Sequence, residues 1–454
     1  MPDFRPLGYL RAMTSPSSLS EIPAAAFRAR RRRVAERLGH GVLVLPAAPP
    51  AVRSRDTTYR YRPDSELAWL CGLTEPGAVA VLVGGEDPEW TLFVPEPDET
   101  STLWSGARLG TEAAAERYGA DETLPRSRLD EAFPPLLHRG DRIHYRLGGD
   151  PRVEHLVRAA LERGRARGPR TGSGPRGVVD PGEVLDELRL RKDEHEVARL
   201  REAARVSVEG HRAGMAAARP GVGEWVVEAE LEAAFRRAGA SGPAFETIVG
   251  AGENACVLHY VRNADTLAAG ELVLVDAGAE LGLYAGDITR SWPVDGRFTP
   301  EQRTAYEVVD AARAAAVAAV APGTTVAEVH ETACRVLVEG LVEMGVLQGR
   351  VEELVEREAH KPWFPHQTSH WLGLDVHDPG DYAVDGTSRP LEPGMVLTVE
   401  PGLYFRPSLA DAGPWAGMGI RVEDAVLVTT DGPENLTAAL PTAPDAVADL
   451  VGSG

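Results

Sequence analysis

The sequence is poor in lysine, in cysteine and in long apolar runs. Of its 48 basic residues only Lys192 and Lys361 are lysines, and the excess of acidic residues gives a net charge of −20. A chain this acidic repels nucleic acid and anionic membranes, so we expect neither as a partner. No apolar run approaches the ~18–20 residues that a membrane-spanning helix needs. The three cysteines (Cys71, Cys256 and Cys334) lack CxxC spacing, and no apolar signal segment precedes the first basic cluster, so we expect a cytoplasmic protein.

The composition, 43% hydrophobic and 26% charged over 454 residues, is that of a globular protein with two or three domains. Residues 1–20 end in a Ser/Thr/Pro-rich stretch and predict a flexible N-terminus. Residues 21–182 alternate short apolar runs with helical segments and predict an α/β domain. We expect the arginine run Arg30–Arg33 on the solvated face of a helix, and a surface loop over residues 163–182. Residues 183–454 form the second domain, which opens with a long helix over about 181–218.

The second domain contains an internal repeat. Helices break at Pro220-Gly221 and again, roughly a hundred residues later, at Pro322-Gly323. Each helix pair leads to an apolar strand that begins after a glycine and ends with an acid two residues before another glycine. Two half-domains related by a pseudo-twofold axis would place these acids, Asp276 and Glu400, in equivalent positions. The predicted fold class is therefore α/β (α+β), with an N-terminal α/β domain and a pseudo-twofold C-terminal domain.

Two acids flank a predicted hairpin. If its turn centres on Leu281-Gly282, Asp276 and Asp287 lie directly opposite each other, with Cβ atoms ~4.5–5.5 Å apart. Carboxylates that close repel unless they share a proton or bind a cation. The alternative is a solvated hairpin with acids at its ends, but strongly apolar residues flank both acids.

Further polar residues cluster in two later segments. His366, His370 and His377 fall within twelve residues and are interleaved with Trp and Leu, which favours a pocket with inward-facing imidazoles on strand and loop. Arg421 and Glu423 alternate with apolar neighbours and so share one strand face. Taken alone, that second segment is typical of an exposed edge strand with a surface ion pair.

Together these segments supply four carboxylates and one imidazole. Such a set suits Mn²⁺ first, then Co²⁺, Fe²⁺ or Zn²⁺, and four carboxylates favour two ions over one. Two neighbouring ions generate a nucleophile at neutral pH, so the sequence predicts metal-assisted hydrolysis. The candidate ligands are Asp276, Asp287, His370, Glu400 and Glu423.

Six ordered blocks carry a resemblance to a known family. They are 248–260, 275–278, 285–290, 369–378, 398–402 and 419–424, with Trp104-Ser105-Gly106 in the N-terminal domain. With these blocks the chain resembles Xaa-Pro aminopeptidase (aminopeptidase P) of the pita-bread metallopeptidases over essentially its whole length. The resemblance implies release of an N-terminal residue that precedes proline, peptides with proline in second position as partners, and assembly as a homodimer or homotetramer.

The resemblance also implies roles for individual residues. Asp287 and Glu423 resemble ligands that bridge the two metals, with Asp276 on one metal and His370 and Glu400 on the other, and a bridging hydroxide as nucleophile. Glu400 resembles the residue that shuttles the proton. The implied catalytic residues are His259, His366, His377, Glu400 and Arg421, and the implied substrate-binding residues are Trp104, Tyr404, His366 and His377.

The sequence departs from the family pattern near the substrate subsites. Gln367 and Thr368 follow His366 where the family often has glycine, Pro379 replaces an apolar residue, and the arginine expected after His377 aligns ambiguously with Arg389. The nearest alternative is prolidase, which shares the fold and all five ligands but acts on Xaa-Pro dipeptides. A binding module that has lost its metals is a second alternative, disfavoured because every ligand is present.

Overall fold

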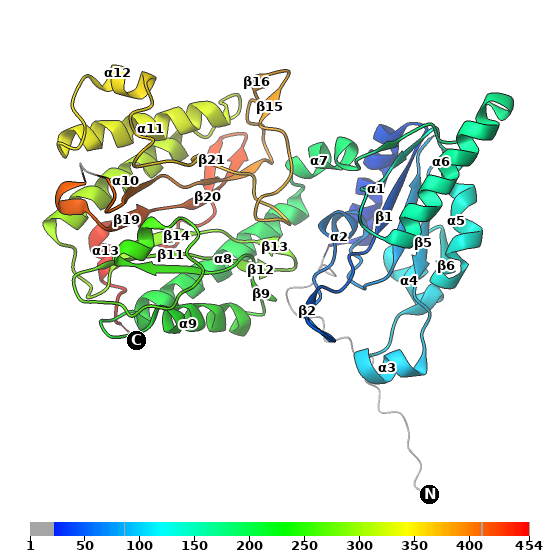
Figure 1. Ribbon diagram of the computed structural model, residues 1–454, viewed down its shortest axis with the longest axis horizontal. Coiled ribbons are helices and arrows are strands. Elements are labelled where there is room, and N and C mark those ends of the chain that lie inside the picture. The colour runs from blue at the N-terminus through cyan, green and yellow to red at the C-terminus, as the bar shows by residue number, and fades with distance from the viewer. Residues whose placement is uncertain (1–21, 86, 410–411, 454) are drawn as a thin grey trace, which may run out of the picture. The chain divides into compact units, whose positions relative to one another are not determined.

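The computed structural model describes residues 22–85, 87–409 and 412–453 (Figure 1). The predicted flexible segment 1–20 lies outside them. The chain divides into two compact units, with the boundary between Leu188 and Arg189. This boundary lies within helix α7 (Gly182–Leu190), a few residues beyond the predicted division between 182 and 183. The mixed α/β class predicted from the sequence is confirmed.

The N-terminal unit is built on a six-stranded mixed sheet in the order β6-β5-β4-β1-β7-β8. The central strands β1 and β4 are buried along their length because their Val and Leu side chains are covered on both faces. The strands are β1 (Gly41–Pro46), β4 (Val79–Val83), β5 (Glu89–Val94), β6 (Glu122–Pro125), β7 (Arg142–His144) and β8 (Val178–Val179), with a small hairpin of β2 (Val52–Ser54) and β3 (Thr57–Thr58).

The helices of this unit correct two expectations. Helix α6 (Pro151–Thr171) includes the first half of the predicted loop 163–182, because its Arg and Ala residues favour helix up to the glycine at its C-terminus. In α1 (Ala24–Leu38), Arg30 and Arg31 are buried rather than solvated. Arg30 donates to the Trp69 carbonyl oxygen (2.9 Å) and stacks over the Trp69 ring. The other helices are α2 (Ser65–Cys71), α3 (Glu99–Ser105), α4 (Gly110–Tyr118) and α5 (Leu129–Leu137).

The C-terminal unit places strands between two helix pairs. In Figure 1, α8 (Glu194–Ala217) and α9 (Glu224–Arg237) lie below the strands, and α10 (Pro300–Ala319) and α11 (Val326–Glu343) lie above them. Side chains of β11 (Leu272–Asp276) alternate between the two pairs: Val273 and Val275 pack with α8 and α9, whereas Leu272 and Leu274 pack with α10 and α11. The two shorter helices are α12 (Val351–Glu356) and α13 (Pro444–Ala448).

The strands of this unit form several small antiparallel sheets. Those that matter for the site are β11 paired with β14 (Thr289–Pro293), and β17 (Val396–Val399) paired with β20 (Asp424–Thr429). The remaining strands are β9 (Gly242–Pro243), β10 (Ile248–Ala251), β12 (Ala279–Leu281), β13 (Tyr284–Ala285), β15 (Ala383–Val384), β16 (Thr387–Ser388), β18 (Gly402–Phe405), β19 (Met418–Arg421) and β21 (Gly432–Asn435).

The long helix predicted over 181–218 is two helices. It breaks between Leu190 and Glu194, where Asp193 caps α8 by accepting from the backbone N–H groups of His195 (3.0 Å) and Glu196 (3.0 Å). The Glu196 side chain accepts from the Asp193 N–H in return, which completes a capping box. Throughout the described part of the chain, every helix is too short or too polar to cross a bilayer.

Candidate metal centre

Four acids lie at corresponding ends of the two antiparallel strand pairs. Asp276 ends β11 and Asp287 lies two residues before β14. In the other pair, Glu400 directly follows β17 and Glu423 directly precedes β20. The Glu423 N–H donates to the Thr289 carbonyl oxygen (3.0 Å), so the two pairs meet at the point where all four acids emerge.

The predicted hairpin exists, but its register differs by two residues. The turn centres on Gly282 and Leu283, both with positive φ (58° and 69°), and Asp276 therefore faces Thr289 rather than Asp287. Two successive positive φ angles are typical of a type I′ turn, and the leucine gave no signal of one. Asp287 lies opposite Gly278 on the same face as Thr289. A Cβ atom at Gly278 would lie 1.6 Å from the Gly286 carbonyl oxygen, so glycine is required there.

His370 completes the cluster from the segment between α12 and β15. Its Nδ1–H donates to the Trp371 carbonyl oxygen (3.1 Å), which leaves Nε2 free as a ligand. Nε2 lies 3.4 Å from Asp287 Oδ2 and 3.7 Å from Glu400 Oε1. One donor atom each of Asp287, His370 and Glu423 lie within 4.8 Å of one another. The structure thus brings the predicted ligands together.

The electrostatics of the cluster fit divalent cations. Burial and the charge of Asp276 raise the pKa of Asp287 well above its ordinary value, and burial and Asp287 do the same to the pKa of Glu423. Burial and the charge of Glu423 raise the pKa of Glu400 to about 8. Asp276 Oδ1 is buried and has no hydrogen-bond partner among the described residues. Buried carboxylates that repel one another, with an unpartnered oxygen among them, are what a bound cation stabilises.

Arg421 and Thr289 form hydrogen bonds with two of the four carboxylates, those of Asp276 and Glu423. Arg421 Nη2 donates to Asp276 Oδ2 (2.6 Å), and its Nε donates to Thr289 Oγ1 (3.1 Å). The Thr289 hydroxyl donates in turn to Glu423 Oε2 (2.6 Å). Arg421 and Glu423 are both buried, so the reading of their segment as an exposed edge strand is wrong. Thr289 was not among the predicted site residues, although it lies in block 285–290, two residues after Asp287.

A cavity of about 480 Å³ opens onto the carboxylates. Three further predicted residues, His259, His366 and His377, line it together with Gln367. The His377 ring lies edge-on against His370, with ring centroids 4.4 Å apart. The apolar wall of the cavity is formed by Phe245, Ile248, Leu258, Val261 and Val376.

Tyr404 lies behind this wall rather than in it. It is 1% exposed, and its hydroxyl lies 2.8 Å from His366 Nε2 and 2.9 Å from Arg421 Nη1. His366 Nδ1 donates to the Gln367 carbonyl oxygen (2.8 Å), so Nε2 of the neutral ring accepts from Tyr404. Burial and the charge of Arg421 lower the pKa of His366 to about 3, which keeps the ring neutral. Tyr404 therefore positions His366.

The other residues singled out from the sequence lie elsewhere. Trp104 belongs to α3 in the N-terminal unit, with its side chain 81% exposed. Thr368 is fully buried and its carbonyl oxygen accepts from the Glu400 N–H (2.8 Å). Asp378, one residue before Pro379, is buried in ion pairs with Arg189 (2.7 Å) and Lys192 (3.0 Å). Arg389 is buried, outside the lining of the cavity.

A mixed α/β chain with buried carboxylates and an imidazole lining one cavity has the donor set of a metal-dependent hydrolase. Comparisons with known proteins agree: "Metallopeptidase family M24" matches residues 198–430 and "Aminopeptidase P, N-terminal domain" matches residues 27–144. The Xaa-Pro aminopeptidase of Escherichia coli K12 is 41% identical over 436 residues, 95% of this chain and 99% of the relative. The chain belongs to metallopeptidase family M24.

Solved structures extend the match to the whole architecture. Proline aminopeptidase P II from Yersinia pestis is 43% identical with a TM-score of 0.90, over 94% of this chain and 99% of that chain. A zinc-substituted Escherichia coli aminopeptidase P in complex with product is 40% identical with a TM-score of 0.89, over 94% and 98%. These relatives confirm the predicted enzyme class, an aminopeptidase, and support it over the prolidase alternative.

Proposed function

We propose that this chain releases the N-terminal residue from peptides whose second residue is proline, using two divalent ions, with Mn²⁺ ahead of Co²⁺, Fe²⁺ and Zn²⁺. The observation that carries the proposal is the convergence of Asp276, Asp287, Glu400, Glu423 and His370 Nε2 on one cavity floor. The names of the relatives support the proline specificity.

The five converging residues would hold the ions. Bound there, divalent ions supply an activated water molecule at neutral pH and polarise a peptide carbonyl. Glu400 lines the cavity and its Oε2 lies 3.6 Å from His366 Nδ1. A carboxylate that lines the cavity can accept a proton from water and return it, which suits Glu400 to carry the proton to the departing amine.

His259 and His377 are proposed to bind the scissile carbonyl. Both face the cavity, and burial lowers the pKa of His377, so its neutral ring can donate one N–H. Donors aimed at a developing negative charge stabilise the transition state. His366, held by Tyr404, and Arg421, held against Asp276, complete the proposed catalytic set.

Three further proposals concern the chain's surroundings. Trp104 is proposed as a substrate contact, and Leu103 and Trp104 of α3, 82% and 81% exposed, are side chains that assembly into a homodimer or homotetramer would cover. A cytoplasmic location is supported by three cysteines that form no disulfide.

A paired hydrolysis assay tests the proposed function. Protein stripped with a chelator and reloaded with Mn²⁺ is given an Xaa-Pro-Xaa tripeptide and, separately, an Xaa-Pro dipeptide of the same first residue. We expect cleavage of the tripeptide at a higher kcat/KM, none of a matched Xaa-Ala-Xaa peptide, and loss of activity with chelator. Preference for the dipeptide would make the chain a prolidase. If the metal-loaded protein cleaves neither peptide, the proposed proline specificity is refuted.

A further inference from the structure

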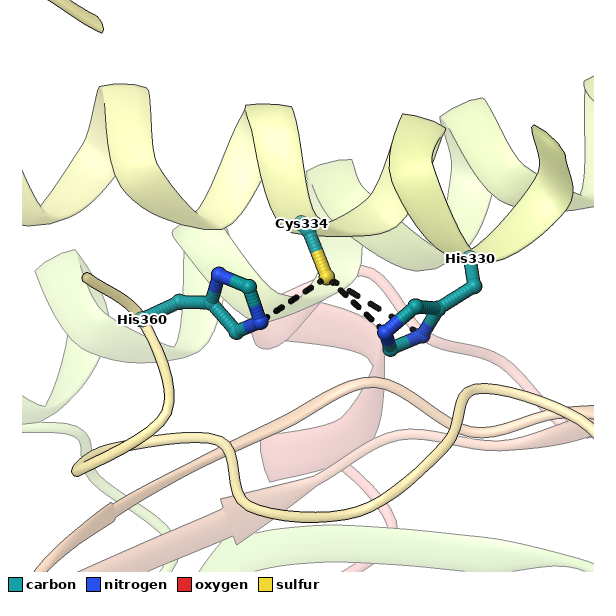
Figure 2. A group of neighbouring side chains, drawn as sticks. All are labelled: His330, Cys334 and His360. Atoms are coloured by element: carbon teal, nitrogen blue, oxygen red, sulfur yellow. Dashed lines mark hydrogen bonds between the residues drawn. The ribbon is translucent and has the colours of Figure 1, made fainter. Parts of the chain in front are cut away.

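A second group of metal-binding side chains lies apart from the carboxylates. His330 and Cys334 project from α11 one helical turn apart, and His360 follows α12 in a turn that faces them (Figure 2). Cys334 Sγ lies 3.4 Å from His330 Nε2 and 3.4 Å from His360 Nε2. One donor atom from each residue lies within 4.8 Å of the others. None of the three lines the cavity of the carboxylate centre.

We propose that His330, Cys334 and His360 form a separate binding site for a thiophilic divalent ion, Zn²⁺ in the first place. Bond lengths of ~2.3 Å to sulfur and ~2.0–2.1 Å to nitrogen in a tetrahedral zinc site place sulfur and nitrogen about 3.6 Å apart. Both observed separations are close to that value, so the side chains need little movement to bind. One thiolate and two imidazoles are the soft and borderline donors that select zinc over manganese.

Burial is the largest influence on the protonation of these donors. Cys334 and His360 are buried, and burial raises the pKa of the Cys334 thiol to about 12 and lowers the pKa of both imidazoles. The histidines are thus neutral. Binding forms a metal–sulfur bond and releases the thiol proton to solvent, one proton for each ion. His360 Nδ1, which has no hydrogen-bond partner among the described residues, carries the ring proton while Nε2 binds.

An outer partner orients His330. Its Nδ1 accepts from the Thr368 N–H (3.2 Å) and lies 2.7 Å from Thr368 Oγ1, so Nε2 of the neutral ring carries the proton and faces Cys334. Binding an ion through Nε2 moves that proton to Nδ1, where Thr368 Oγ1 accepts it. Among the residues that the structure describes, no fourth imidazole, thiol or carboxylate joins this group. Three protein ligands leave the fourth position to water. Since the Thr368 carbonyl oxygen also accepts from the Glu400 N–H, the proposed site contacts the carboxylate centre through one residue.

Cobalt titration tests the proposal, because Co²⁺ bound to thiolate absorbs in the near ultraviolet and Co²⁺ bound to carboxylates does not. Full-length Asp287→Asn protein, in which the carboxylate centre is weakened, is titrated with Co²⁺ under reducing conditions. We expect a thiolate-to-cobalt band that saturates at one ion per chain and is displaced by Zn²⁺. Cys334→Ser should abolish the band, and Cys256→Ser, which alters another buried thiol, should leave it unchanged.

A second measurement does not depend on the cysteine variant folding. X-ray absorption of the Asp287→Asn protein with one equivalent of Zn²⁺ should show one sulfur neighbour at ~2.3 Å and nitrogen neighbours at ~2.0–2.1 Å. His360→Gln should weaken binding by more than the roughly 10–100-fold that follows loss of an outer partner. A zinc shell of oxygen and nitrogen alone, or a cobalt band that survives in Cys334→Ser, would overturn the proposal. Hydrolysis of proline peptides is measured in a separate assay, and its result does not test the proposed zinc site.

Discussion

Removing the buried carboxylate of Asp378 should destabilise the C-terminal unit strongly. Burial raises the pKa of Asp378, but the charges of Lys192 and Arg189 lower it by a larger amount. The pKa of Asp378 is therefore below its ordinary value. The side chains of Asp378, Lys192 and Arg189 are 2%, 1% and 4% exposed, so the three charges have little contact with water. In Asp378→Ala, Lys192 loses the carboxylate of Asp378, and Arg189 loses this buried partner while its pair with the half-exposed Asp375 remains. Breaking a buried pair in this way costs about 3–5 kcal/mol.

Hydrogen exchange measured by mass spectrometry suits this test, because the chain has two units and a single unfolding curve would mix them. Peptides from β17 and α10 should lose about 3–5 kcal/mol of protection in Asp378→Ala. The matched control is Glu434→Ala, which breaks a pair with Arg201 whose side chains are 50% and 37% exposed and should change protection by under about 1 kcal/mol. Equal, small effects in both variants would refute the reasoning. Asp378→Asn with Lys192→Met should recover part of the loss, because one uncompensated cation is gone.

Three further predictions concern the site and the pH dependence of stability. Asp287→Ala should abolish metal binding at one or both positions and eliminate activity, measured by metal analysis and peptide hydrolysis; near-normal turnover would contradict the two-ion proposal. Tyr404→Phe should leave the fold intact but lower kcat/KM by roughly 5–150-fold, the equivalent of about 1–3 kcal/mol, because His366 and Arg421 lose their shared hydroxyl; unchanged kinetics would refute the positioning role. Burial lowers the pKa of His211 from 6.5 to about 4, so the unfolded chain binds a proton that the folded chain refuses between those values. His211 alone should therefore contribute a loss of stability of roughly 3 kcal/mol as the pH drops from 6.5 to 4, and His211→Gln should remove this contribution from the profile in urea titrations.

Local sequence patterns located the ligands but not their spatial partners. Asp276, Glu400 and Glu423 were found because each acid adjoins an apolar strand, a signal that needs no knowledge of the fold. The pairing of Asp276 with Asp287 was misplaced by two residues because Leu283 adopts a positive φ, a conformation that few leucines adopt and that no neighbouring residue announces. The break before α8 does have a signal, Asp193 followed by Glu196, but it lies within a strongly helical stretch whose composition favours a continuous helix.

Burial of charge was the harder quantity to predict. Arg30, Arg31 and Arg421 are charged residues in segments whose sequence resembles a solvated surface, and only the folded chain supplies the carbonyl oxygens, rings and carboxylates that cover them. The group of His330, Cys334 and His360 shows the same limit. Two of its members share a helix face at positions i and i+4, but the third lies 26 residues beyond Cys334, where no periodicity points to it.

The division of the four acids between two strand pairs determines when the metal centre can form during folding. Thr289 and Glu423, whose hydrogen bonds join the pairs, are 134 residues apart in sequence. Contacts of such long range are made late, because the chain between them must be ordered first. Neither strand pair alone supplies more than two of the four carboxylates, so nascent chains that lack β20 have no complete site. Metal capture is thus a signal that both halves of the catalytic unit have folded and met.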